Sequence, residues 1–150
     1  MADHRATQIF ARFGVLLNNL ATTGANIFPH RGYALAENVN NALTTRLGPD
    51  MPVADEGYTN IGFMDMDLII HVRIHARTTE ANLDDQLMLI RKEIHIALMA
   101  DHTLGLAFVL DIIPAGMDEP SYESDGEKPT IAADTHWKVR YRHSITDPSA

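Results

Sequence analysis

The residues best suited to metal binding or acid–base catalysis are the histidines and aspartates that alternate with apolar residues between positions 62 and 77. Asp65, Asp67, His71 and His75 all fall on the same side of that alternation. Imidazole and carboxylate groups bind zinc and exchange protons with substrates. On a strand, however, His71 and His75 lie about 13 Å apart, which is too far for one metal ion. The pair alone predicts no metal site.

Sequence motifs for other catalytic chemistry are missing. The chain has no cysteine, so thiolate ligands, cysteine nucleophiles and disulfides are excluded. The segment Glu93-Ile94-His95 lacks the second histidine of an H-E-x-x-H motif, and no G-x-S-x-G or G-K-[ST] sequence occurs. We therefore predict no catalytic residues, no metal ligands, no cofactor and no enzymatic activity. The remaining enzymatic hypothesis is a metal-dependent enzyme that uses the strand face with His71 and Asp65.

Basic side chains form two series at strand spacing in a chain of formal net charge −8. The series are His71, Arg73, His75 and Arg77, and His136, Lys138, Arg140 and Arg142. On neighbouring strands they would form one positive stripe. One interpretation is a docking surface for acidic residues of a neighbouring subunit, with Asp118, Glu119 and Glu123 as candidates. The alternative is ion pairing within one chain, to Asp65, Asp67 and Asp134.

The N-terminal third has a readable beginning and an ambiguous end. Apolar residues at helical spacing predict a helix over residues 3–22, with Asp3 as its N-cap and Gly24 after its last turn. A short strand at Ile27-Phe28 should end at Pro29. Residues 34–60 fit a short amphipathic helix, with a turn at residues 55–57; the apolar positions of that helix would be Leu35, Val39, Leu43 and Leu47.

The rest of the chain gives stronger patterns. Period-two alternation over residues 62–77 predicts a long strand with one buried face. A helix follows over residues 83–101, and a strand over residues 108–113. Residues 115–130 are acidic and rich in Pro, Gly and Ser, which predicts an exposed, mobile loop. The last strand should span residues 131–145.

The predicted helix at residues 83–101 is apolar on two sides. Its core stripe is Leu83, Leu87, Ile90, Ile94, Ala97 and Leu98, and its second stripe is Met88, Leu89, Ile96 and Met99. Packing of the second stripe on the first helix is the favoured interpretation, and a subunit interface is the alternative.

These elements predict one α+β domain over residues 1–150, with a mostly antiparallel sheet and two main helices packed on one face. The acidic charge disfavours nucleic-acid affinity. The start of the chain has no signal-peptide pattern, and no apolar run approaches the roughly 18 residues of a membrane span.

The ordered patterns of the chain resemble those of tail terminator and minor tail proteins of long-tailed, lambda-like bacteriophages. The resemblance rests on residues 83–106, on Ile113-Pro114-Ala115-Gly116 with the acidic segment after it, and on residues 137–142. The N-terminal helix followed by Ile27-Phe28 and Arg31 also fits. Residues 34–60 depart from the family pattern, being longer.

The resemblance implies a structural protein of the virion, located at the head-proximal end of the tail and assembled in the host cytoplasm. Its subunits would form a hexameric ring that caps the tail tube and then joins the head connector. The implied partners are other copies of the chain, the tail tube protein and the neck protein, with DNA passing through the ring without specific binding. A head-completion or neck protein of the same virion is the alternative.

Overall fold

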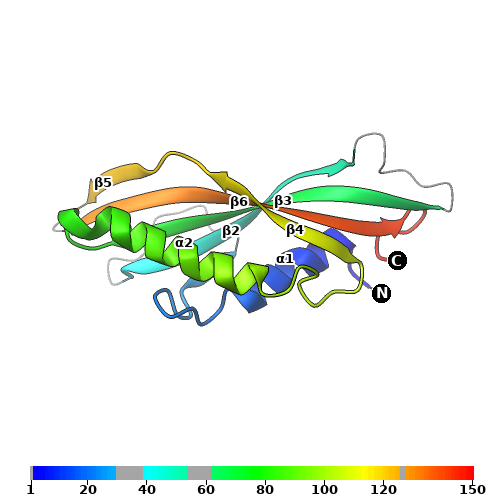
Figure 1. The fold of residues 1–150 in the computed structure, drawn as a ribbon, viewed down its shortest axis with the longest axis horizontal. Helices are drawn as coiled ribbons and strands as arrows, with labels where there is room; N and C mark the ends of the chain where they lie inside the picture. The colour runs from blue at the N-terminus through cyan, green and yellow to red at the C-terminus, as the bar shows by residue number, and fades with distance from the viewer. Residues whose placement is uncertain (1, 30–38, 54–61, 126–127) are drawn as a thin grey trace.

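The computed structural model describes residues 2–29, 39–53, 62–125 and 128–150, and shows two helices on a long sheet (Figure 1). In chain order the elements are α1 (Arg5–Leu16), β1 (Ile27–Pro29), β2 (Asn41–Pro52), β3 (Phe63–Arg77), the 3₁₀ turn η1 (Glu80–Asn82), α2 (Leu83–Met99), β4 (Val109–Met117), β5 (Ser121–Asp125) and β6 (Lys128–Ser144).

The sheet is mostly antiparallel and runs in the order β1-β2-β3-β6-β4, with β5 also paired to β6. Among the described strands, only β1 and β2 pair in parallel. The two longest strands form its centre, where β3 and β6 stay in register from the pair Phe63–Ser144 to the pair Arg77–Thr130. The predicted α+β class with a mostly antiparallel sheet is therefore confirmed.

Alternation along the two central strands separates a buried face from a face that no described helix covers. On β3 the buried residues are Leu68, Ile70, Val72, Ile74 and Ala76. On β6 they are Ile131, Ala133, Thr135, Trp137, Val139, Tyr141 and His143. Because directly opposed residues of an antiparallel pair share a face, the two rows form one apolar surface. The predicted faces of both strands are confirmed.

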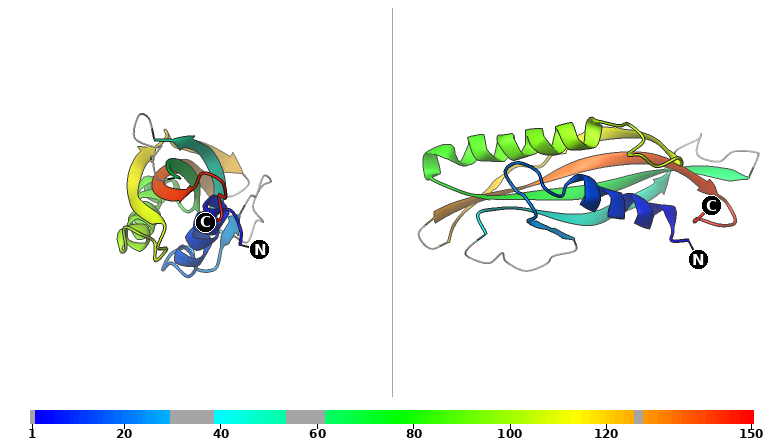
Figure 2. Two further views of the ribbon diagram at one scale, coloured as in Figure 1. Left: turned by 90° about the vertical axis from the view of Figure 1, so that its right-hand side faces the viewer. Right: turned by 90° about the horizontal axis from the view of Figure 1, so that it is seen from below.

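Both helices cover this apolar surface. From α1, Ile9 and Phe13 enter the core, and the core stripe of α2 is buried as predicted, except that Ala97 is half-buried. Seen end on, the sheet curves around the two helices (Figure 2). The opposite face of the sheet is left to polar side chains.

The first helix is shorter than predicted. It ends at Leu16 instead of residue 22, and His4 caps its start instead of Asp3, since His4 Nδ1 accepts a hydrogen bond from the Ala6 amide at 3.0 Å. The helix cannot continue because Asn19 takes a left-handed backbone, with φ of 64°. Apolar spacing alone did not reveal this break.

The helix predicted from Leu43 and Leu47 is wrong, because these residues belong to strand β2. There Leu43 faces the core and pairs with Ile74 of β3. Pairing along a partner strand outweighs helical spacing over so short a segment. The strand shifts register between Leu47 and Asp50, and this irregularity accommodates Gly48-Pro49. Leu35, Arg31 and the turn at 55–57 lie outside the described residues.

The predicted mobile loop at residues 115–130 is also wrong for most of its length. Strand β4 continues to Met117, and β5 pairs with the beginning of β6. Acidic side chains are compatible with a strand at the edge of the sheet, where water still solvates them. Glu123 projects from β5 and is exposed, whereas Asp118 and Glu119 lie in the short connection between β4 and β5.

Candidate functional site

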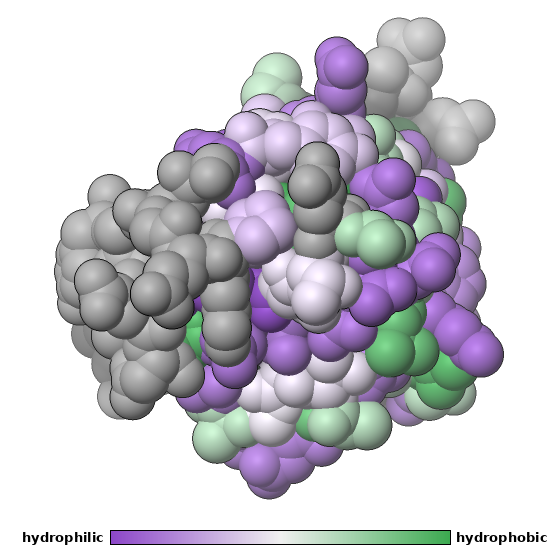
Figure 3. Space-filling model, turned by 90° about the vertical axis from the view of Figure 1, so that its left-hand side faces the viewer, coloured by the Kyte–Doolittle hydropathy of each residue, from purple (hydrophilic) through white to green (hydrophobic). Residues whose placement is uncertain are grey.

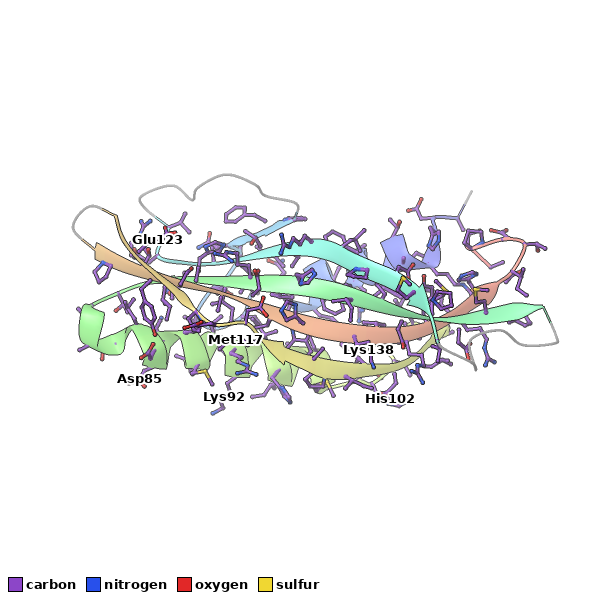
Figure 4. All side chains as sticks on the ribbon, turned by 90° about the horizontal axis from the view of Figure 1, so that it is seen from above. Asp85, Lys92, His102, Met117, Glu123 and Lys138 are labelled. Carbon is purple, nitrogen blue, oxygen red and sulfur yellow. The ribbon has the colours of Figure 1, made fainter. Side chains whose placement is uncertain are left out.

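The face of the sheet opposite the helices carries the ionisable residues that the sequence singled out. The register of β3 and β6 places Asp65 opposite Arg142 and Asp67 opposite Arg140. Lys138 lies on the same face of β6, beside β4 (Figure 4). The two basic series are therefore neighbours, as the predicted stripe requires.

Most arginines of the stripe form ion pairs within the chain. Arg142 and Arg140 each make two hydrogen bonds to their opposed aspartates, with the shortest N–O distances at 2.7 Å and 2.9 Å. The hydrogen bond to Asp65 raises the pKa of Arg142. Arg73 pairs with Asp134 at 3.1 Å. Partly exposed pairs of this kind contribute about 0–1 kcal/mol each. This arrangement matches the second interpretation of the stripe, and docking of a neighbour on it stays a prediction.

The other basic residues of the stripe differ in their surroundings. His75 Nε2 lies 3.3 Å from Thr44 Oγ1. The backbone N–H of Arg77 donates to the Asn40 carbonyl oxygen at 2.7 Å. Lys138 lies opposite Ile69 and makes no ion pair with the described residues. Lys138 is thus available for an external partner.

A histidine pair bridges the two central strands. His71 Nδ1 lies 2.6 Å from His136 Nδ1, and His136 Nε2 lies 2.8 Å from Asp118 Oδ1. Burial, then His136 and Arg46, lower the pKa of His71. Because one nitrogen must donate and the other accept, the neutral pair holds a single proton between the two rings.

Sequence reasoning paired His71 with His75 and missed this partner. His136 is 65 positions away, and only the register of β3 and β6 brings the two rings together. Their positions on outward faces of predicted neighbouring strands were the available signal. The chain Asp118–His136–His71 can hold and transfer a proton.

Next to this pair lies a small hollow of about 180 Å³, lined by Thr44, Thr45, Arg46, Arg73 and Asp134. It is smaller than the roughly 300–1,000 Å³ of most small-molecule sites. One carboxylate oxygen of Asp134 is buried there without a hydrogen-bond partner. Within the described parts of the chain, no three His, Asp or Glu side chains converge as metal ligands.

The second apolar stripe of α2 is not covered by the first helix. Met88, Leu89 and Ile96 are 49%, 45% and 60% exposed, so the favoured interpretation is wrong for these three residues. Met99 instead packs partly against the core. We call the side chains of Met88, Leu89 and Ile96 the α2 ridge. An uncovered apolar stripe of this kind is typical of an interaction surface.

Both edges of the sheet also expose apolar side chains, which sequence reasoning missed. On β2 they are Leu47 and Met51, and on β4 they are Leu110 and Ile113. Beyond Thr45, β2 pairs only with β3 among the described strands, and β4 pairs only with β6. No sequence signal indicated the exposure of Leu47, which was assigned to a helix. Leu47 lies opposite the buried Ile70, and strand alternation would place it on the buried face with Leu43.

The acidic candidates lie near β5 and the start of α2. Glu119 and Glu123 are exposed, while Asp118 contacts His136 through the 2.8 Å approach of its Oδ1 to Nε2. The hydroxyl of Tyr122 donates to Asp84 at 2.6 Å, which ties the strand to the helix. Figure 3 views this end of the molecule, where the visible coloured surface is mainly hydrophilic. Glu119 and Glu123 therefore remain accessible to an external cationic surface.

In comparisons with known proteins, no protein-family model and no curated protein matches the chain. In the described part of the chain, no helix has the length and apolar character needed to span a membrane.

Proposed function

We propose that this chain is a structural, non-enzymatic subunit that assembles into a closed ring. The observation that carries the proposal is the exposure of apolar side chains at both edges of one sheet. Met51 lies on the β2 side and Ile113 on the β4 side. Two different surfaces on opposite sides of a subunit allow head-to-tail contacts, which close into a ring when the rotation fits. Open strand edges also favour pairing between subunits.

The ring we propose is the tail terminator of a long-tailed bacteriophage, with six subunits. Support comes from the ordered sequence resemblance and from the α+β fold that it implied. The ring caps the tail tube and presents a joining surface to the neck protein, at the head-proximal end of the virion tail. A chain of net charge −8 suits a channel through which DNA slides without sticking.

The native mass tests the ring. We expect light scattering after size-exclusion chromatography to give about six times the chain mass of 16.7 kDa, either for the free protein or after addition of purified tail tubes. Electron microscopy of that species should show a central hole. A monomer that neither forms rings nor binds tail tubes contradicts the proposal, and binding to head connectors instead of tails favours the neck protein.

Edge variants test which surfaces form the ring. Met51→Glu and Ile113→Glu place a charge on either edge and should each abolish the six-subunit species. Val15→Glu is the matched control, because Val15 is 62% exposed and belongs to α1, not to either edge strand. Rings that persist in both edge variants would exclude the edges as the contact.

A further inference from the structure

The α2 ridge shares its narrow stripe of the helix with two opposite charges. Asp85, Met88, Leu89, Lys92 and Ile96 follow the i, i+3, i+4, i+7, i+11 spacing of one helix face. Figure 4 labels Asp85 and Lys92 along α2, both directed away from the sheet. The stripe therefore begins with a carboxylate and has an ammonium group at its middle.

Neither charge has an ionic partner in the part of the chain that the structure describes. Asp85 and Lys92 are both exposed, and among the described residues neither forms an ion pair. Seven residues of α-helix separate them by about 10 Å, at about 1.5 Å per residue, so they cannot pair with each other on one helix. Any ion pair between these positions needs a second molecule.

We propose that the α2 ridge binds the same ridge of a second copy, with the two helices antiparallel about a twofold axis between Met88 and Leu89. This register places Asp85 of each chain against Lys92 of the partner subunit, twice. It also brings the two Met88 and the two Leu89 side chains together at the centre. In this antiparallel arrangement, the positive N-terminal end of each helix lies toward the negative C-terminal end of the other, which is electrostatically favourable.

The charges favour this register over other alignments of the two helices. Moving the twofold axis to Lys92 would bring two ammonium groups together at the centre, and parallel helices in register would set Asp85 against Asp85. Only the antiparallel arrangement centred on Met88 and Leu89 combines apolar contact with two opposite-charge pairs. Such complementarity sets the orientation of a contact more than its strength.

The proposed contact between the two helices is small, so its affinity should be low. In this register Met88 and Leu89 meet their counterparts, whereas Ile96 lies opposite position 81 of the partner, before α2 begins. The contact therefore has far fewer residues than the roughly 20–30 per side of a stable interface. We therefore expect a dimer in the micromolar to millimolar range. A twofold contact closes with two copies, so it is separate from the head-to-tail contacts of the proposed ring and does not depend on them.

Charge reversal provides the test, by sedimentation velocity over micromolar to millimolar protein. Asp85→Lys and Lys92→Asp each set like charges together twice and should each weaken dimerisation about tenfold or more. An equimolar mixture of the two variants places opposite charges at both contacts of the mixed pair. The mixture should therefore recover the dimer. His102→Asp, an exposed change beyond α2, is the control and should dimerise as the unaltered chain does.

If the chain forms rings, the charge-reversal variants are measured in a chain that also carries Met51→Glu and Ile113→Glu, which should prevent ring formation. The ring and the dimer are then tested independently of each other. A chain that is monomeric at millimolar concentration overturns the proposal. So does a mixture no more associated than either variant alone. Because the chain has no cysteine, oxidation of Met88→Cys gives an independent check: a crosslinked dimer forms across the twofold axis if the proposal is correct, and none forms if it is wrong.

Discussion

At the scale of single residues, the outward face of β3 and β6 shows how register turns a row of charges into ion pairs. Asp67 and Arg140 are far apart in sequence, yet the antiparallel pairing sets them directly opposite. Each of these arginine–aspartate pairs removes a cation from the predicted stripe. Lys138, opposite Ile69, keeps its charge available because its neighbour is apolar.

The histidine pair predicts a pH dependence of stability. Burial lowers the pKa of His71 below its ordinary value of 6.5, so below that pH the unfolded chain binds a proton that the folded chain does not. The free energy of unfolding should therefore fall as pH drops through about 6.5 and until the lowered pKa is reached. Urea unfolding at a series of pH values measures this slope.

Variants separate this effect from other titrations. His71→Gln should flatten the slope just below pH 6.5, while His102→Gln, a change at an exposed histidine, should leave it unchanged. An equal slope in the chain and in His71→Gln would show that the pKa of His71 is not lowered in the folded protein.

At the scale of elements, β2 fits against β3 only because Gly48 lacks a side chain. A Cβ at this position would lie 2.6 Å from His71 Nε2 and 2.9 Å from the Ile69 carbonyl oxygen. The second contact is with backbone, which cannot rotate away. The irregularity between Leu47 and Asp50 thus brings β2 into close contact with the histidine pair.

Gly48→Ala should accordingly destabilise the protein by about 1–3 kcal/mol, through overpacking. Gly14→Ala is the matched control: nothing lies within 4 Å of its Cβ position in α1, and alanine favours a helix. We expect Gly14→Ala to stabilise the protein by about 0.5–1 kcal/mol. Urea denaturation of both variants measures the two shifts, and equal shifts would contradict the close approach at Gly48.

At the scale of the whole molecule, charge governs the interaction with DNA. Ion pairing within the chain leaves few free cations on the sheet face, and the formal net charge is −8. We expect duplex DNA to bind more weakly than about 100 μM at physiological salt. Fluorescence anisotropy with a labelled duplex measures this, and tight, salt-dependent binding would contradict a ring through which DNA slides freely.

The sequence by itself determined the elements whose periodicity is long. Fifteen residues of alternation in β3 and seventeen residues of helix in α2 repeat their patterns often enough to identify both elements and their buried faces. The apolar residues of these two elements also predicted the class of fold. The second stripe of α2 was visible in the sequence for the same reason.

Only the tertiary structure decided which residues meet across strands and which apolar stripes stay exposed. Strand β2 was mistaken for a helix because Leu43 and Leu47, four positions apart, fit both the helical and the strand period. Only pairing with β3 distinguishes the two. His71 meets His136, and β5 pairs with β6, through contacts that no local pattern encodes. The exposure of the α2 ridge depends on where α1 lies, because packing between helices is set by the sheet on which both rest.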